Sequence, residues 1–177
     1  MSGSNLTQLI VLGSTAVDRV SEAHIVNMAQ SFMPKFWSPT TDVINDTILS
    51  SLHDGFLIYG DKHDDTPTLT LTASGRQQFN KLMLADHKGL STPSNLAFEA
   101  AQLCFLDVAD SQTLNAFLEK LSTKIDAEIN SFQDRIDRCP HIGKFTQAWI
   151  DVEIRRLENI ATLVTTTATN IEMAQFK

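Results

Sequence analysis

The sequence predicts a mainly α-helical protein with one two-stranded antiparallel sheet in its N-terminal half. Between residues 36 and 84 an amphipathic helix, a short strand, an acidic loop, a second strand and another helix follow one another without spare residues. From Ser94 onward the chain carries no strand signal, and its apolar residues recur at spacings of three and four. The 177 residues, 42% of them apolar, are enough to bury a core in this arrangement.

Two short helices are expected ahead of this segment. Residues 5–12 predict the first helix, and Gly13 is expected to end it. The second helix is expected to begin after the capping residue Ser21 and to end at Pro34, which lacks a backbone N–H. The expected apolar positions are Leu6, Leu9 and Ile10 in the first helix and Ile25, Met28, Ala29 and Phe32 in the second.

A third helix is expected over residues 39–52, with Ser38 as its N-cap and a proline at the first helical position, where the missing N–H costs no hydrogen bond. Gly55 is expected to end it. The helix carries no lysine and no arginine, and Asp42 and Asp46 lie on its polar side. Its expected apolar face consists of Val43, Ile44, Ile48, Leu49 and Leu52.

A hairpin and a fourth helix are expected next. One strand is predicted over residues 56–59 and the other over residues 68–72, where threonine alternates with leucine. The eight residues between the two strands are rich in turn formers and are expected to be a loop. The fourth helix is predicted over residues 74–84, capped by Thr72 or Ser74.

A cluster of small and turn-forming residues then marks the predicted domain boundary. This cluster contains Gly89, Ser91, Thr92 and Pro93, and it separates two segments of different periodicity. We therefore expect residues 1–88 to form the first domain and residues 89–177 to form a helical dimerisation domain.

Three helices are predicted in the C-terminal part, over residues 96–108, 111–139 and 144–174, with Asp110 capping the middle one. The last two are expected to form an antiparallel hairpin, which alone cannot cover both of its apolar faces. We therefore expect a homodimer, in which a second subunit covers them. The apolar positions are Leu114, Leu118, Leu121, Ile125, Ile129, Phe132 and Ile136 in the first long helix, and Phe145, Trp149, Val152, Leu157, Ile160, Val164 and Ile171 in the second.

Composition and motifs exclude several classes of protein. The formal net charge of -7 argues against binding a polyanion by bulk attraction. The sequence has no nucleophile elbow, phosphate-binding glycine loop or His-Glu metal spacing, so we expect no enzyme, no cofactor and no metal. Cys104 and Cys139 are expected to be reduced and to pack as small apolar residues. The N-terminus lacks a signal sequence, which favours a cytoplasmic protein without membrane association.

The predicted order of elements is that of a winged helix-turn-helix domain, and four motifs make the chain resemble the PadR family of transcriptional regulators. Trp37-Ser38-Pro39 opens the third helix, and Leu52 to Phe56, with Gly55, leads into the first strand. The other two motifs are Leu71-Thr72-Ala73-Ser74-Gly75-Arg76 after the second strand and Gln147-Ala148-Trp149-Ile150 in the last helix.

The resemblance implies a DNA-binding regulator, often a repressor, that acts as a homodimer on a palindromic operator and places its third helix in the major groove. The family usually carries a tyrosine and one or two cations in this helix, whereas this chain has Ile44 or Asn45 and Ser50 or Ser51 in those places. The candidate DNA-contacting residues are Lys35, Ser38, Thr40, Thr41, Asn45, Thr47, Ser50, Lys62 and Arg76.

The acidic character of the third helix leaves a second interpretation open. Asp42 and Asp46 would face the groove, and DNA affinity depends on neutralising phosphates, so these carboxylates oppose binding. The alternative is an acidic winged-helix module that binds a basic protein partner instead of DNA.

Three aromatic residues are candidates for binding a small aromatic effector. Trp149 and Phe145 lie one turn apart in the last helix, and Trp37 precedes the third helix. They could line an apolar cavity for a planar ligand at the dimer interface. The alternative is that they pack in the dimer core without a ligand.

Overall fold

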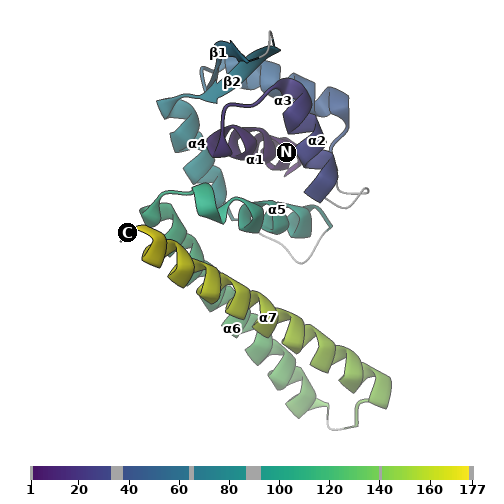
Figure 1. Cartoon of the computed structure of the whole chain (residues 1–177). Coiled ribbons are helices and arrows are strands. Elements are labelled where there is room, and N and C mark those ends of the chain that lie inside the picture. The colour runs from purple at the N-terminus through teal and green to yellow at the C-terminus, as the bar shows by residue number, and fades with distance from the viewer. Residues whose placement is uncertain (1, 33–37, 64–65, 87–92, 140, 176–177) are drawn as a thin grey trace. The chain divides into compact units, whose positions relative to one another are not determined.

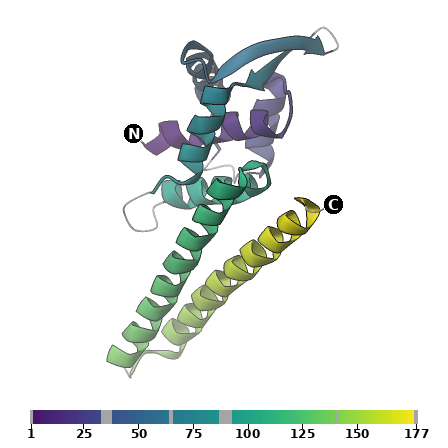
Figure 2. The same cartoon turned by 90° about the vertical axis from the view of Figure 1, so that its left-hand side faces the viewer.

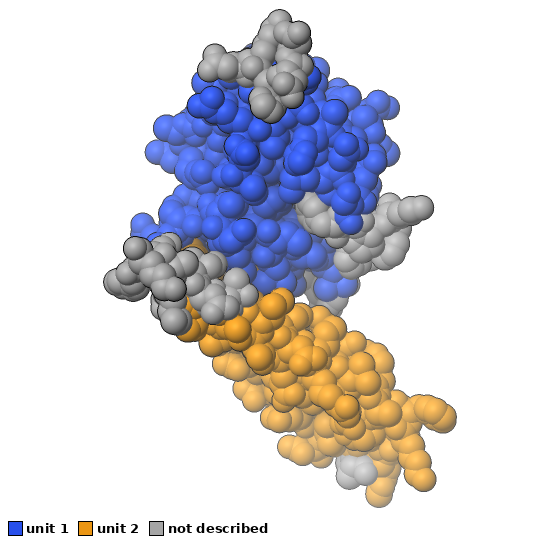
Figure 3. Space-filling view, in the orientation of Figure 1, with its two compact units in different colours: residues 1–113 blue, residues 114–177 orange. Residues whose placement is uncertain are grey.

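The computed structural model describes two compact units, residues 1–113 and residues 114–177 (Figures 1 and 3). The first unit contains a two-stranded sheet and five α-helices, together with a short 3-10 helix. The second unit is built from two long helices. The described residues are 2–32, 38–63, 66–86, 93–139 and 141–175.

The first helix, α1 (Ser2–Val17), is the central element of the first unit. It contacts α2 (Glu22–Phe32), α3 (Thr41–His53), α4 (Ala73–Met83) and α5 (Pro93–Cys104), as Figure 1 shows. The side chains of Leu9, Ile10, Val11 and Leu12 are all fully buried. Four consecutive residues of a helix point to all of its sides, so the burial of this run shows that other elements surround α1 at this point.

The expectation that Gly13 ends the first helix is wrong, because α1 continues to Val17. Gly13 lies against the buried ring of Phe105, and a Cβ atom at this position would come within 2.6 Å of the Phe105 Cδ2 atom. The glycine is therefore required by packing and does not mark a helix end. Ser14 and Thr15 follow inside the helix, where their hydroxyl groups donate hydrogen bonds to carbonyl oxygens of the preceding turn.

The wing consists of β1 (Leu57–His63) and β2 (Thr66–Leu71), paired antiparallel with Leu57 opposite Leu71 and His63 opposite Thr66. Both strands extend into the eight residues expected to form a loop, so that expectation is wrong. Cross-strand hydrogen bonds satisfy backbone groups that an open loop would leave to water. The pairing has an irregularity between Tyr59 and Lys62.

A third segment, which was not predicted from the sequence, joins the base of this sheet. Val20, in the connection between α1 and α2, forms an antiparallel bridge with Leu69. The Leu69 N–H donates to the Val20 carbonyl oxygen at 2.8 Å, and the Val20 N–H donates to the Leu69 carbonyl oxygen at 3.4 Å. Both side chains are buried, so the bridge ties the wing to the helical core.

Gln102 of α5 holds the C-terminal end of α4 through its side-chain amide. Its Nε2 group lies 3.1 Å from the Leu82 carbonyl oxygen, 2.9 Å from that of Met83 and 3.3 Å from that of Ala85. The last carbonyl groups of a helix have no partner within the helix, and here a buried side chain supplies one. After α5 the chain forms the 3-10 helix η1 (Leu106–Val108).

The second unit is an antiparallel hairpin of α6 (Ser111–Arg138) and α7 (Lys144–Gln175), as Figures 1 and 2 show. Asp110 caps α6, accepting a hydrogen bond from the Thr113 N–H at 2.7 Å, as expected from the sequence. All seven apolar positions expected in α6 are buried or half-buried.

The apolar positions expected in α7 were predicted to form one stripe, but they divide between two faces. Leu157 and Val164 are buried, and Ile150, seven residues before Leu157, completes this inner row. Phe145, Trp149 and Val152, which were expected in the same stripe, are exposed. At about 100° per residue they lie roughly a third of a turn away from the inner row. The side chain of Ile171 lies outside the described residues.

Cys104 and Cys139 are free thiols on exposed residues, so the expectation that they pack in the interior is wrong. Among the described residues, no helix combines the length and the apolar character needed to cross a membrane.

Candidate nucleic-acid interface

The third helix, α3, presents one face to the interior of the first unit and the opposite face to solvent. Ile44, Ile48 and Ser51 are its buried residues. Val43 and Leu49 were expected in the buried stripe, but they are 45% and 61% exposed, so this part of the prediction is wrong. The buried row follows the spacing 44, 48, 51, which leaves both apolar side chains outside it.

Acidic and apolar side chains occupy the middle of the exposed face of α3. Asp42, Asp46, Leu49 and His53 follow one another at spacings of four, three and four, and all are exposed. Ser50 lies beside them. The expectation that Asp42 and Asp46 point outward therefore agrees with their exposure, and no cation accompanies them on this helix.

The start of α3 differs from the prediction. The N-cap is Thr40, not Ser38, and the Thr40 side chain makes no capping hydrogen bond. The Ser38 hydroxyl group instead donates to the Ala29 carbonyl oxygen at 3.2 Å, which ties the segment to α2. Thr40 and Thr41 are exposed, so their hydroxyl groups are open to a ligand at the N-terminal end of the helix.

The other polar candidates on α3 lie toward the edges of the exposed face. Asn45 and Thr47 are half-buried, and the Thr47 hydroxyl group donates to the Val43 carbonyl oxygen at 2.7 Å. Lys35 lies outside the described residues. Lys62 is part of β1, opposite Pro67.

Arg76 uses part of its hydrogen-bonding capacity within the first unit. Its Nη1 atom donates to the Val108 carbonyl oxygen at 2.8 Å, and its Cζ atom lies 5.9 Å from the centre of the Phe79 ring. The hydrogen bond to Val108 connects α4 to η1.

A compact set of hydrogen bonds fixes the wing to the end of α3, and it lies within the motif that follows the second strand. The Thr72 hydroxyl group lies 2.7 Å from the Gly55 carbonyl oxygen and 3.1 Å from that of Phe56, and it accepts a hydrogen bond from the Gly75 N–H at 3.0 Å. The Ser74 hydroxyl group also donates to the Gly55 oxygen, at 2.8 Å. We call these residues, Gly55, Phe56, Thr72, Ser74 and Gly75, the wing clasp.

Two glycines make the wing clasp possible. Gly55 has φ +72°, a left-handed conformation that other residues adopt only with strain. Gly75 is so close to the backbone of Phe56 that an added Cβ atom would overlap the Phe56 carbonyl oxygen. The clasp therefore sets the position of the wing relative to α3 through backbone contact.

A side-chain hydrogen bond also joins the wing to α2. The Tyr59 hydroxyl group donates to the Glu22 Oε1 atom at 3.0 Å. This hydrogen bond, together with partial burial and the negative charge of Glu22, raises the pKa of Tyr59 above its usual value of 10.0. A raised pKa in the folded state means that this contact stabilises the fold below pH 10 and is lost as the pH rises through the folded-state pKa.

Tyr59 is the only tyrosine in the chain, so its ionisation can be followed directly. We expect the tyrosinate absorbance near about 295 nm to rise with a midpoint above that of free tyrosine, about 10. In Glu22→Gln the midpoint should move down, because both the charge and the strong acceptor are removed. An unchanged midpoint in this variant would contradict the contact.

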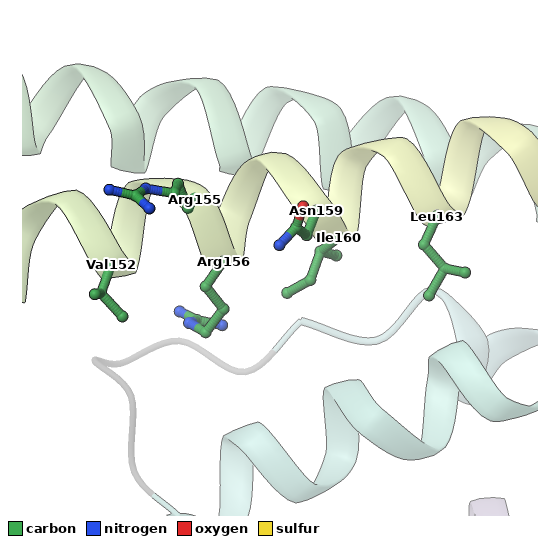
Figure 4. A pocket seen from close by; sticks show the side chains of 6 residues that line it. All are labelled: Val152, Arg155, Arg156, Asn159, Ile160 and Leu163. Atoms are coloured by element: carbon green, nitrogen blue, oxygen red, sulfur yellow. The ribbon is translucent and has the colours of Figure 1, made fainter.

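The candidate effector residues lie in the second unit, apart from Trp37, which is outside the described residues. Trp149 packs edge-on against Phe132 of α6 with ring centres 5.9 Å apart, and Phe145 is 94% exposed. Neither lines the open groove of about 500 Å³ on α7, shown in Figure 4. The groove is lined by Val152, Arg155, Arg156, Asn159, Ile160 and Leu163.

The hairpin wing, the exposed helix before it and the helical core define a winged-helix protein of the kind found in transcriptional regulators. The sequence profile of AphA-like transcriptional regulators matches residues 2–166, and the chain belongs to this family. This match confirms the resemblance to a family of transcriptional regulators found in the sequence.

Several solved structures are similar to this chain. Bacillus subtilis PadR in complex with p-coumaric acid has 14% sequence identity, with 96% of this chain and 97% of that one covered and a TM-score of 0.43. The same regulator in complex with operator DNA has 16% identity, coverage of 93% and 98%, and a TM-score of 0.40. A PadR-like regulator from Bacillus cereus has 14% identity, coverage of 95% and 99%, and a TM-score of 0.39. No curated protein sequence matches the chain.

Proposed function

We propose that the protein is a cytoplasmic, homodimeric transcriptional regulator that represses genes by binding a palindromic operator. The observation that carries this proposal is the exposed outer face of α3, held beside a wing by the wing clasp in a chain of this family. A two-fold dimer would place two such helices in successive major grooves, about one turn of DNA apart.

The exposed apolar row on α7 supports the homodimer. Phe145, Trp149, Val152 and Leu163 are 94%, 55%, 59% and 60% exposed. Together with two polar residues, Arg156 and Asn159, they occupy positions 145, 149, 152, 156, 159 and 163, which alternate spacings of four and three as in a coiled-coil seam. The inner row of α7, roughly a third of a turn away, already packs on α6, so this exposed row needs a further helix to cover it, and a second copy of the chain supplies one.

Leu163→Glu tests the dimer. Sedimentation equilibrium should show a dimer for the wild type and a dissociation constant about a hundredfold or more higher for the variant, because each copy loses a buried leucine contact. Thr162→Glu is the matched control, since this exposed neighbour lies off the row. Equal dissociation constants for both variants and the wild type would place the dimer interface elsewhere.

DNA binding is tested by fluorescence anisotropy at low salt, with duplexes enriched by the protein from a random-sequence library. We expect sequence-specific binding. The logarithm of the affinity should fall with the logarithm of the salt concentration with a small slope, because few cations neutralise phosphates. Thr40→Ala and Ser50→Ala should weaken it, as both hydroxyl groups are exposed on or beside α3.

A second function is favoured by one observation, the exposed carboxylates of Asp42 and Asp46 on a helix without cations. In this alternative the outer face of α3 binds a basic protein partner and DNA is not the ligand. Failure to enrich any duplex, with the dimer intact, would support it.

We further propose that a small aromatic effector binds at the second unit, near Trp149 and Phe145, and shifts the regulator between states. Support comes from the half-exposed Trp149 ring and the neighbouring exposed Phe145. Tryptophan fluorescence should be quenched by the effector in the wild type and much less in Trp149→Phe. Quenching that persists unchanged in the variant would exclude this location.

A further inference from the structure

The chemistry of the outer face of α3 limits which bases it can read. Guanine presents two acceptors in the major groove, which proteins usually read with arginine or lysine. The helix Thr41–His53 contains neither. Its only basic side chain is His53 at the C-terminal end, where its Nδ1 atom lies 3.3 Å from the Asp54 carboxylate.

What the face does offer is apolar surface and hydrogen-bond acceptors. Val43, Asp46 and Leu49 follow one another at spacings of three, so they form a row along the exposed side. Val43 is 45% exposed and Leu49 is 61% exposed. In the major groove the matching features are the thymine methyl group for an apolar side chain and the amino groups of cytosine and adenine for a carboxylate.

We propose that α3 reads its operator through thymine methyl groups, contacted by Leu49 and Val43, beside a cytosine or adenine whose amino group donates to Asp46. This inference rests on the proposed DNA-binding function and specifies its ligand. The Asp46 carboxylate binds only where a base presents a donor, and it repels the acceptor edge of guanine. The acidic residue therefore contributes to specificity, while phosphate contacts come from residues outside the row.

The row is placed on the helix by the core, not by its own sequence. Ile44 follows Val43 in sequence, and Ile48 precedes Leu49. Both isoleucines are fully or almost fully buried, and they fix the rotation of α3. Truncating Leu49, which is 61% exposed, is expected to leave that rotation unchanged. Leu49→Ala is therefore expected to fold with an unchanged melting temperature.

The test replaces thymine by deoxyuridine, which lacks only the C5 methyl group, at one position at a time in the duplex best enriched from the random-sequence library. For the wild type, at least one replacement in each half-site should weaken binding about fourfold, the value for one buried methyl group. For Leu49→Ala the same replacement should change the affinity less than about twofold, because the methyl group has lost its contact. Asp46→Asn should relax the selection against guanine at the neighbouring base.

Val17→Ala is the matched control, because Val17 is a similarly exposed apolar residue, 54% exposed, that belongs to α1 and not to the row on α3, and this variant should keep the full deoxyuridine effect. Tight, specific binding without any deoxyuridine effect would overturn the inference and leave the proposed function standing. If no duplex is enriched, both fail, and the outer face of α3 is assigned to a protein partner.

Discussion

Gly75→Ala is expected to unfold the first unit or to lower its free energy of unfolding by about 3 kcal/mol or more. The added Cβ atom would overlap the Phe56 carbonyl oxygen, and this neighbour is backbone held by the wing clasp, so it cannot turn aside as a side chain would. The Thr72 hydroxyl group would also lose its hydrogen bond from the residue 75 N–H if the helix start moved. Urea unfolding followed by circular dichroism measures the loss.

Gly143→Ala makes the same chemical change in open space, because no atom lies within 4 Å of a Cβ added there. Its effect should stay within about 1 kcal/mol. A similar loss for both variants would mean that the crowding at Gly75 is relieved by a small shift of β1, and the clasp would then be less rigid than described.

Gln102→Glu is expected to cost about 3 kcal/mol at neutral pH, although the side chain keeps its length. The substitution removes the amide donor that serves Leu82, Met83 and Ala85, and it places a buried carboxylate among their carbonyl oxygens. Because the carboxylate is disfavoured in the fold, its pKa should rise above that of an exposed glutamate, and acidification should restore part of the stability. The free energy of unfolding at neutral and at mildly acidic pH tests both statements.

Gln102→Met is the control for Gln102→Glu, since methionine has a similar length and no charge. It should lose only the hydrogen bonds, about 1 to 2 kcal/mol, and its stability should not recover on acidification. Equal losses and equal pH profiles for the two variants would show that the carbonyl groups of α4 reach water when Gln102 is replaced.

The sequence predicted the order of the elements in the first unit well, because helix starts such as that of α4 carry a local signal. Thr72 is the N-cap of α4, and its side chain accepts from the Gly75 N–H, as its position before the helix suggested. The end of α1 was wrongly predicted at Gly13, because glycine occurs both at helix ends and where elements pack closely. Only the position of Phe105, far away in sequence, decides between these two uses.

The exposed face of α3 was only partly predictable. Asp42 and Asp46 were expected to point outward and are exposed, because charged residues seldom face a core. Leu49 was expected to be buried because it is apolar, while the buried Ser51 took its place in the inner row. The spacing from Ile44 to Ile48 and Ser51 was present in the sequence, but hydropathy alone could not select it over the neighbouring spacing that contains Leu49.

In α7, too, the sequence does not show which of the apolar residues are buried. A helix with apolar residues on two sides gives no sequence signal that separates the intramolecular contact from the exposed row. Ile150, Leu157 and Val164 are distinguished from Phe145 and Trp149 only by their burial. The residues proposed to contact DNA or an effector depend on molecules that bind from outside, and no pattern within the chain alone determines such contacts.

The bridge between Val20 and Leu69 has a consequence for how this wing can change in evolution. The base of the wing is held on one side by the connection between α1 and α2 and on the other side by the wing clasp. An insertion near the base would shift the register and turn Leu69 out of the core. Residues can be added or removed beyond the Tyr59–Leu69 pair, where the pairing already tolerates an irregularity between Tyr59 and Lys62, so the length of the wing can vary while its anchorage stays constant.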